Sequence, residues 1–281
     1  MKPIRFAVVG DPVAHSRSPA MHAAAYRLFG LPHTYEAIRA TPSELSRIVD
    51  DLRRGVFGGL NVTVPHKQRV LDLVDEVDRS ARVIGAANTL VRSSDGSVVA
   101  HNTDAPALAE EFRRLAGSET GAAGGRGLVL GSGGAARAAI AAFAELGAAE
   151  IVVRARAFED GQRLAEFART TFAPVTCQPW SALAPSEQGT FAVVQATSAG
   201  MSGADPGDGV AEVVAWDHLP DRAVAIDVVY APRDTPFLRA ARARGLVCDN
   251  GLGMLARQGA LAFELWLGIL APLDAMRAAL E

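Results

Sequence analysis

The sequence predicts an α/β protein with two domains, the second of Rossmann type, and with a ligand cleft between them. Three observations predict this class. Strand-like and helix-like segments alternate along all 281 residues, a pattern typical of largely parallel sheets. A Gly-rich stretch at residues 117–127 interrupts the alternation. Directly after it, a buried strand runs into G-x-G-x-x-A and begins a new βα series. Ligands commonly bind where two such domains meet.

The composition excludes several functional classes. Apolar residues make up 49% of the chain and the mean hydropathy is +0.14, which excludes a disordered protein. No uncharged apolar run is long enough to span a bilayer, and the first ten residues have too short an apolar core for a signal peptide. A net charge of −3 leaves no basic surface for nucleic acid or a membrane. We therefore expect no nucleic-acid and no membrane partner. The expected partner is a small-molecule substrate, and the sequence leaves open whether the protein is a monomer or a homodimer.

Cysteine and lysine usage adds two expectations. Cys177 and Cys248 lie far apart without metal-ligand spacing, which is typical of a reducing cytoplasm and predicts no metal site. Lys2 and Lys67 are the only lysines among 28 basic residues. A lysine retained in so arginine-rich a chain therefore needs a specific reason.

The first domain is expected at residues 1–104. Ser18-Pro19 is typical of a helix N-cap followed by Pro at the first helical position, and Gly30 of that helix's end. Thr41–Glu44 has the pattern of a capping box, and Gly55 is placed to end the helix that follows. The predicted strands are Ile4–Val9, Thr34–Ile38, Gly59–Val64, Thr89–Arg92 and Val98–His101.

The second domain is expected at residues 105–250. It begins with a helix over Ala105–Ala116, and residues 117–127 follow as a flexible connection. A new series of alternating strands and helices then starts. The predicted strands are Leu128–Leu130, Ile151–Val153, Val175–Cys177, Ala192–Gln195, Val224–Val229 and Leu246–Cys248.

The Gly-rich turn at residues 128–137 is the candidate dinucleotide site. Gly131 permits the tight bend, Gly133 lets the backbone approach a pyrophosphate, and the small Ala136 lets helix and strand pack closely. The helix N-terminus adds free N–H groups and positive potential. The βαβ spacing favours nucleotide binding over an ordinary Gly-rich turn. The residues expected at the cofactor are Gly131, Ser132, Gly133, Gly134 and Ala135.

The end of the next strand predicts which dinucleotide is used. An acidic residue there would bind the ribose diol of NAD, whereas an arginine would accept the 2′-phosphate of NADP. The chain has Arg154 and Arg156 at this point and no acid. We therefore expect NADP, with NAD also possible, and the sequence leaves open which arginine meets the phosphate. Both could instead be solvated surface residues.

Two hydroxyls lie beside the first helix of the N-terminal domain. Ser16 and Ser18 follow the first strand at alternate positions, where a helix N-terminus favours a small anion such as a carboxylate. Ser18 is equally well explained as a plain N-cap. Ser16 has no such structural explanation.

A second polar cluster surrounds the retained lysine. Alternation along Gly59–Val64 places Asn61 and Thr63 on one face of the strand. Pro65 is expected to start a helix with Lys67 in its first turn, where the helix dipole and partial burial would lower the pKa of Lys67. The pKa of an arginine is too high for proton exchange, so a lysine here indicates acid–base catalysis.

Asn88 and Asp104 complete the candidate catalytic set. Asp104 could also be an N-cap of the next helix, and Asn102 could be a turn residue. A Lys–Asp pair facing a nicotinamide would form a proton relay coupled to hydride transfer. If the strands are parallel, their carboxyl ends bring five residues to one rim. These are Ser16, Asn61, Lys67, Asn88 and Asp104.

Taken together, these clusters resemble the shikimate dehydrogenase family. The matching segments occur in the family's order and span nearly the whole chain. They are Gly10–Pro19, Asn61–Lys67, Gly85–Thr89, Asn102–Asp104, Gly131–Ala136, Ala196–Met201, Tyr230–Pro232 and Gly251–Gln258.

The resemblance implies NADP-dependent reduction of 3-dehydroshikimate to shikimate, in the cytoplasmic pathway to chorismate and the aromatic amino acids. It implies that the N-terminal domain binds substrate and that residues 251–281 form a helical segment packing back onto it. Lys67 and Asp104 would be the catalytic pair. The resemblance assigns the substrate to Ser16, Ser18, Asn61, Thr63, Asn88, Tyr230 and Gln258, and adds Thr197, Ser198 and Gly251 to the cofactor site.

The chain departs from the family pattern at several positions. Arg154-Ala155-Arg156 replaces the usual Asn-Arg-Thr, which keeps a basic character but moves the arginine. Gln195 stands where Asn is usual, Ala105 where Gly is common and Asn250 where Asp is common. None of these changes affects the proposed catalytic pair.

Two alternatives remain open at this stage. The first is an NAD-using quinate/shikimate dehydrogenase, or an amino-shikimate relative, whose pocket tolerates a different ring substituent. The second is a non-catalytic sensor that binds dinucleotide, which predicts loss of the pair that Lys67 and Asp104 here retain.

Overall fold

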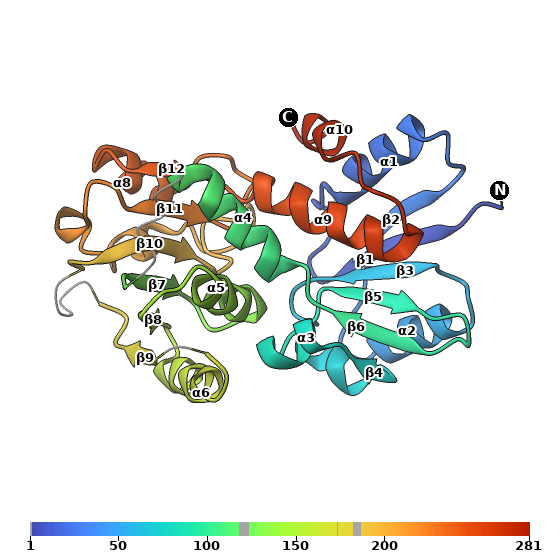
Figure 1. The fold of residues 1–281 in the computed structure, drawn as a ribbon, viewed down its shortest axis with the longest axis horizontal. Coiled ribbons are helices and arrows are strands. Elements are labelled where there is room, and N and C mark those ends of the chain that lie inside the picture. The colour runs from blue at the N-terminus through green and yellow to red at the C-terminus, as the bar shows by residue number, and fades with distance from the viewer. Residues whose placement is uncertain (1, 118–123, 173, 182–186) are drawn as a thin grey trace. The chain divides into compact units, whose positions relative to one another are not determined.

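The computed structural model describes residues 2–117, 124–172, 174–181 and 187–281, and it has the α/β class that the sequence predicts. The chain divides into two compact units (Figure 1). The first consists of Met1–Asp104 and Leu255–Glu281, and the second of Ala105–Met254. Residues 118–123 of the expected flexible connection lie outside the described residues.

The first unit contains a mixed six-stranded sheet in the order β2-β1-β3-β5-β6-β4. Its strands are β1 (Arg5–Gly10), β2 (Thr34–Arg39), β3 (Gly59–Val62), β4 (Glu76–Val77), β5 (Thr89–Arg92) and β6 (Val98–His101). β1 is parallel to β2 and β3, whereas β5 is antiparallel to both β3 and β6. The sheet is thus only partly parallel, and the condition of parallel strands does not hold for β5. The connection from β5 to β6 is a tight turn at residues 93–97, and a turn this short can join only antiparallel strands.

Five α-helices belong wholly or largely to the first unit. They are α1 (Ser18–Leu28), α2 (Leu45–Arg53), α3 (Arg79–Ile84), α9 (Leu252–Leu267) and α10 (Leu273–Ala278). The Thr41 N–H donates to the Glu44 carboxylate at 2.8 Å, half of the predicted capping box. Gly30 and Gly55 follow the ends of α1 and α2 with φ angles of 61° and 77°, as their predicted role requires.

Each face of this sheet has its own core. On one face, α2 buries Leu45, Ile48, Val49 and Leu52 against apolar side chains of β1, β3, β5 and β6. An aromatic cluster joins α1, β1, β2 and α9. The Trp266 indole N–H donates to the Leu90 carbonyl at 3.0 Å, which ties α9 to the sheet. Residues far apart in the chain are thus fixed in one unit.

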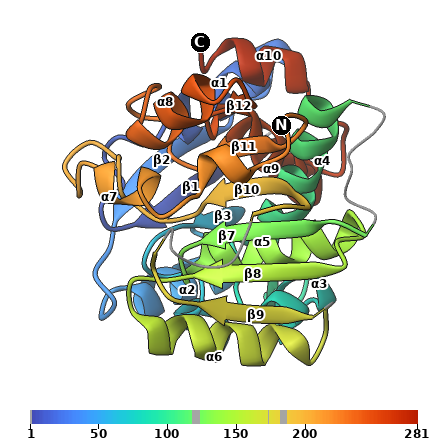
Figure 2. The ribbon, with the colours of Figure 1, turned by 90° about the vertical axis from the view of Figure 1, so that its left-hand side faces the viewer.

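The second unit is a parallel six-stranded sheet in the order β12-β11-β10-β7-β8-β9 (Figure 2). Its strands are β7 (Arg126–Leu130), β8 (Glu150–Arg154), β9 (Val175–Gln178), β10 (Thr190–Gln195), β11 (Val224–Asp227) and β12 (Val247–Asp249). Its helices are α4 (Asp104–Ala116), α5 (Gly134–Glu145), α6 (Phe158–Arg169), α7 (Asp208–Ala211) and α8 (Pro236–Ala243). Strand order reverses between β7 and β10, as in Rossmann folds, and ligands bind at the carboxyl ends of such a pair.

Candidate active site

The predicted catalytic residues gather at one rim of the first unit's sheet. β1, β3 and β6 are mutually parallel and end at this rim, while the antiparallel β5 begins there. Asn88 precedes β5, so reversal of that strand still leaves Asn88 at the same rim. Asn61 lies within β3, and the other four expected residues lie in the segments that adjoin β1, β3, β5 and β6 at this rim, although the assumption of parallel strands fails for β5.

Lys67 and Asp104 form a close ion pair. The Lys67 Nζ lies 2.6 Å from the Asp104 Oδ2. Only 15% of the lysine side chain and 5% of the aspartate side chain are exposed, so solvent screens the pair weakly. Short, charge-assisted bonds of this kind hold the ammonium group in one place.

The local structure around Lys67 differs from the prediction. Pro65 does not start an α-helix; residues 63–68 form turns that lead into a short 3₁₀ helix, η1 (Arg69–Asp72). The Lys67 carbonyl accepts the N–H of Ala87 at 2.8 Å, from a distant segment, instead of a helical bond. The helix dipole invoked from the sequence therefore does not act on Lys67. Its position depends on Asp104 and on the Ala87 contact.

Asn88 connects the ion pair to Gln258. The buried Asn88 Nδ2 donates to the Asp104 Oδ1 at 2.9 Å and lies 3.2 Å from the Gln258 Oε1. The Asn88 Oδ1 accepts the backbone N–H of Thr103 at 2.7 Å and the Thr89 hydroxyl at 3.3 Å, and both contacts favour this orientation of the amide. The carboxylate of Asp104 is thus held by Lys67 on one oxygen and by Asn88 on the other.

Asn61 is part of the same network, but its amide is engaged within the protein. Its Nδ2 donates to the Asn88 carbonyl and to the Thr89 hydroxyl, both at 3.0 Å, and its Oδ1 accepts the Tyr35 phenol at 2.7 Å. Both N–H groups of Asn61 are therefore used to hold the rim. Thr63 follows β3 and is partly exposed.

The loop after β1 carries Ser16 and Ser18. Capping of α1 was one of two roles expected of Ser18, but the contact at this helix end comes from Ser16. Ser18 was explained equally well as an N-cap, but it begins α1 as its first residue, and the N-cap, Arg17, makes no side-chain cap bond. The Ser16 hydroxyl accepts the N–H of Ser18 at 3.3 Å and takes over part of that function. Neither serine has a hydrogen bond to the Lys67 network among the described contacts.

The Gly-rich turn of the second unit is a tight bend that leads directly into α5. Gly131 has φ 121°, and a Cβ there would lie 3.0 Å from the Thr197 Cγ2 and 3.1 Å from the Ala196 carbonyl oxygen. Gly133 is the N-cap of α5, and a Cβ on it would meet open space. The first N–H groups of α5 have no partner within the helix, so they remain available to an anion.

The two arginines after β8 have opposite environments. Arg154 is fully buried, and its guanidinium lies 2.6 Å from the buried Glu187 carboxylate and 2.7 Å from the Val213 carbonyl. Its guanidinium is therefore not accessible to a ligand at the surface. Arg156 is 55% exposed and forms an ion pair at 3.1 Å with Asp205. Of the two arginines, the exposed Arg156 is therefore the better candidate to bind a 2′-phosphate.

The remaining predicted residues lie in loops after β10 and β11. Thr197 and Ser198 follow β10, and the Thr197 hydroxyl accepts the N–H of Ala199 at 3.1 Å. Gly251 approaches the chain after β11 so closely that a Cβ would lie 2.3 Å from the Val228 carbonyl oxygen. Tyr230 lies in the same region of the second unit and is half-buried.

Burial raises the pKa of one carboxyl in that region. Asp227, at the end of β11, has its pKa raised to about 7 by burial, although the Thr235 hydroxyl and the Val229 N–H both oppose the change. Thr235 also caps α8 by accepting the N–H of Leu238. Asp227 therefore fixes the loop that carries Tyr230.

Sequence reasoning missed several residues that organise the two sites. Tyr35 and Thr89 hold Asn61 and Asn88, while Glu187 neutralises Arg154. Thr89 stood inside a motif already singled out, so its hydroxyl was a usable signal. Glu187 is 33 residues from Arg154 in the chain, and no local pattern links the two.

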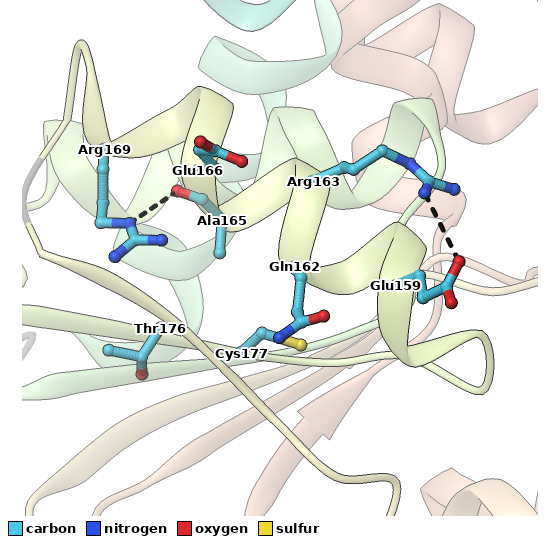
Figure 3. Close-up of a pocket in the computed structure, with 8 residues that line it drawn as sticks. All are labelled: Glu159, Gln162, Arg163, Ala165, Glu166, Arg169, Thr176 and Cys177. Atoms are coloured by element: carbon cyan, nitrogen blue, oxygen red, sulfur yellow. Dashed lines mark hydrogen bonds and ion pairs between the residues drawn. The ribbon is translucent and has the colours of Figure 1, made fainter.

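A charged groove lies elsewhere on the second unit, between α6 and β9 (Figure 3). Its charged groups include Glu159 and Arg163, which form an ion pair at 3.7 Å, and none of its lining residues is among those predicted for a site. Within the described residues, no group of three or more His, Cys, Asp or Glu is placed to hold a metal ion. Among all residues that the structure describes, no helix is both long and apolar enough to cross a membrane.

Comparisons with known proteins agree with the resemblance. Residues 8–90 match the shikimate dehydrogenase substrate binding domain, and residues 251–281 match the shikimate 5′-dehydrogenase C-terminal domain. The shikimate dehydrogenase (NADP(+)) of Methylobacterium radiotolerans is 40% identical over 93% of this chain and 90% of its own. That of Methanopyrus kandleri is 39% identical over 97% and 93%.

Solved structures give the same result. Shikimate 5-dehydrogenase of Thermus thermophilus, in complex with NADP(H) and shikimate, has a TM-score of 0.83 and 38% identity, covering 99% of this chain and 98% of its own. The 5-ketofructose reductase of a Gluconobacter species has a TM-score of 0.86 and 32% identity, covering 100% and 98%. Identity of this extent over nearly the full length shows that the chain belongs to the shikimate dehydrogenase family.

Proposed function

We propose that this protein reduces the ring ketone of 3-dehydroshikimate to the alcohol of shikimate, reversibly, with NADPH as the reductant. The observation that carries the proposal is the buried pair of Lys67 and Asp104, 2.6 Å apart and held by Asn88. Family membership supplies the substrate class, and the pair supplies the proton chemistry that a ketone reduction needs.

The second unit fits a dinucleotide. The close approach of Gly131 to Thr197 leaves no room for a side chain in the turn, and the N-terminus of α5 offers N–H groups for a pyrophosphate. Thr197, Ser198 and Gly251 remain proposed contacts because they lie at neighbouring strand ends. The exposed Arg156 would bind the 2′-phosphate. When bound, the reduced nicotinamide supplies the hydride.

Lys67 handles the proton. As the ketone becomes an alcohol, its oxygen takes a proton from the Lys67 Nζ, and in the reverse direction the neutral amine takes that proton back. Asp104 holds the Nζ, and Asn88 holds the other oxygen of Asp104. Gln258 and Thr63 would contact the ring hydroxyls from the same rim. Proton transfer and substrate orientation thus depend on one network of side chains.

The substrate carboxylate is assigned to the loop after β1. Ser16 and Ser18 lie at the N-terminus of α1, where hydroxyls and a positive helix end favour an anion. Tyr230 remains a proposed substrate residue on the resemblance alone. A second candidate substrate class is a neutral sugar ketone, because one similar structure is a 5-ketofructose reductase. Such a ketone has no carboxylate for the two serines to bind.

We further propose that the protein works in the cytoplasm, where thiols stay reduced. Cys177 and Cys248 are both free. We also propose that it acts as a monomer or a homodimer, two states that sedimentation velocity distinguishes.

Initial rates with purified protein test the function. Shikimate and quinate are oxidised with NADP or NAD in parallel, and 5-ketofructose is offered with NADPH in the reverse direction. Turnover of shikimate with NADP well above every other pair supports the proposal. Equal rates with NAD or quinate would indicate the NAD-using quinate/shikimate dehydrogenase. Preferred turnover of 5-ketofructose would indicate a reductase of sugar ketones, and dinucleotide binding without turnover would indicate a sensor.

A further inference from the structure

A buried phenol lies at the far end of the network that holds the catalytic pair. Tyr35, on β2, is 9% exposed, and its O–H donates to the Asn61 Oδ1 at 2.7 Å. The phenol is thus removed from the Lys67–Asp104 pair by several side chains. The question is what a hydrogen bond at this distance does for the reaction.

The contacts between Tyr35 and Asp104 form one chain of consistent direction. Asn61 accepts at its oxygen and donates from Nδ2 to the Thr89 hydroxyl at 3.0 Å. The Thr89 hydroxyl, having accepted, has its own hydrogen for the Asn88 Oδ1 at 3.3 Å. Asn88 in turn donates from Nδ2 to the Asp104 Oδ1 at 2.9 Å. Every donor along this chain points toward the catalytic carboxylate.

The direction of that chain is set at its start. A side-chain amide can occupy its space in two orientations, with oxygen and nitrogen exchanged. The Tyr35 O–H needs an acceptor and the Asn88 carbonyl needs a donor, so together they select the orientation with the Asn61 oxygen toward the ring and both N–H groups toward Asn88 and Thr89. Without the phenol, the Asn61 oxygen is a buried acceptor lacking this donor, and its orientation is less strongly determined.

We propose that Tyr35 is a positioning residue for Asp104: its phenol fixes the Asn61 amide, and Thr89 passes that orientation to the Asn88 amide that holds the catalytic carboxylate. The claim about catalysis rests on the proposed function. The claim about orientation does not, because it concerns hydrogen bonds within the first unit alone.

The chain offers a matched control for removing the phenol. Tyr26 is also buried in the aromatic cluster, and its phenol oxygen has no hydrogen-bond partner among the described residues. Tyr35→Phe and Tyr26→Phe therefore remove the same atom from comparable surroundings. Only Tyr35→Phe breaks the chain to Asp104. We expect it to lower kcat about 10-fold with the KM for NADPH unchanged, and Tyr26→Phe to change neither.

A second pair of variants tests the middle of the chain. Thr89→Val keeps the shape of the side chain and removes the hydroxyl, whereas Thr89→Ser keeps the hydroxyl. The valine variant should reproduce the loss of kcat seen with Tyr35→Phe, and the serine variant should restore most of it. Equal activity of the two Thr89 variants would contradict the proposal that Thr89 passes the orientation of Asn61 to Asn88.

A spectroscopic readout is independent of turnover. The chain has four asparagines, Asn61, Asn88, Asn102 and Asn250, so protein labelled with ¹⁵N-asparagine gives four pairs of side-chain amide signals. Tyr35→Phe should move the signals of Asn61 and Asn88 and leave that of Asn250, in the second unit, in place. Tyr26→Phe should move none as far. If the Asn88 signal stays in place in Tyr35→Phe, the inference is wrong. If the wild type does not turn over shikimate, the proposed function fails while this readout still decides the relay.

Discussion

The two units place ligand chemistry at strand ends by different means. At the rim of the first unit, the candidate site consists of side chains. They are held together by hydrogen bonds between segments up to 170 residues apart, and they are Lys67, Asp104, Asn88 and Gln258. At the turn of the second unit, the candidate site consists of backbone: Gly131 makes the bend, and the N–H groups of α5 face outward.

This difference teaches where substitutions should act. A network of side chains fails when one member changes, because each partner loses its orientation. A backbone cradle tolerates most side-chain changes, so we expect it to be sensitive only at glycines without room for a Cβ and at Arg156, the arginine that we assign to the 2′-phosphate. Four substitutions test this contrast, in order of decreasing effect.

Loss of the lysine should have the largest effect. Lys67→Ala removes the proton donor, and we expect kcat to fall about 1000-fold while the dissociation constant of NADPH stays unchanged. Stopped assays and a fluorescence titration of NADPH measure the two quantities. Arg69→Ala, an exposed cation two residues away, is the matched control and should behave as wild type. Near-normal turnover of Lys67→Ala would show that neither Lys67 nor the network that holds it is needed for catalysis.

Arg154→Ala should affect stability and leave cofactor choice unchanged. It strands the Glu187 carboxylate in the interior, and breaking such a buried pair costs about 3–5 kcal/mol of unfolding free energy. Urea unfolding measures that loss. Replacing both partners by leucine should recover much of it. A changed ratio of NADP to NAD activity at unchanged stability would show that Arg154 meets the cofactor after all.

Arg156→Ala should show the opposite behaviour. The exposed guanidinium is the group we assign to the 2′-phosphate, so the KM for NADP should rise about 10-fold, while the KM for NAD and the urea midpoint stay unchanged. Arg163→Ala, another exposed arginine of the second unit, serves as the control. An equal rise for both dinucleotides would contradict the assignment.

His22 tests a buried polar group of the first unit that stacks on Tyr35 but makes no side-chain hydrogen bond to the network within the described part of the chain. Both ring nitrogens lack a hydrogen-bond partner among the described residues, and burial lowers the pKa of His22 to about 3. In the unfolded chain His22 takes up a proton near pH 6.5, whereas the folded chain excludes that proton down to about pH 3. The contribution of neutral His22 to the free energy of unfolding is therefore complete above pH 6.5 and is lost as the pH falls below it.

The substitution His22→Phe removes this dependence. Relative to wild type, the variant should gain about 2 kcal/mol of unfolding free energy between pH 7 and pH 5, whatever its packing costs at neutral pH. Urea unfolding at the two pH values measures the gain, and kcat at pH 7 should change little. A difference that is the same at both pH values would show that His22 can be protonated inside the fold.

Much of the fold could be predicted because it depends on local patterns. Thr89–Arg92 and Val98–His101 form strands with the predicted limits, since alternation and flanking turns define each one. The Gly-rich turn was predicted with its strand and helix because glycine there answers a local steric demand. The antiparallel direction of β5 was not predicted, although the short turn after it carried the information.

The errors arose where distant residues override local preference. A helix was expected at Lys67 from Pro65, but a hydrogen bond from Ala87 takes the carbonyl that the helix would use. Arg154 was expected at the surface, available to a 2′-phosphate or to solvent, because its buried partner, Glu187, is remote in the chain. Proximity of Lys67 and Asp104 was inferred from strand ends, and their separation of 2.6 Å came only from the structure.

In the proposed mechanism, Lys67 transfers a proton and does more than supply positive charge. Lys67→Arg tests it most directly, because arginine keeps the charge and can pair with Asp104 but cannot release a proton at neutral pH. Initial rates of shikimate oxidation by NADP are compared with shikimate binding measured by calorimetry. The account predicts that kcat falls by about 1000-fold while shikimate binds within a few-fold of wild type. Turnover within 10-fold of wild type would show that charge alone suffices and would contradict the proton-transfer role.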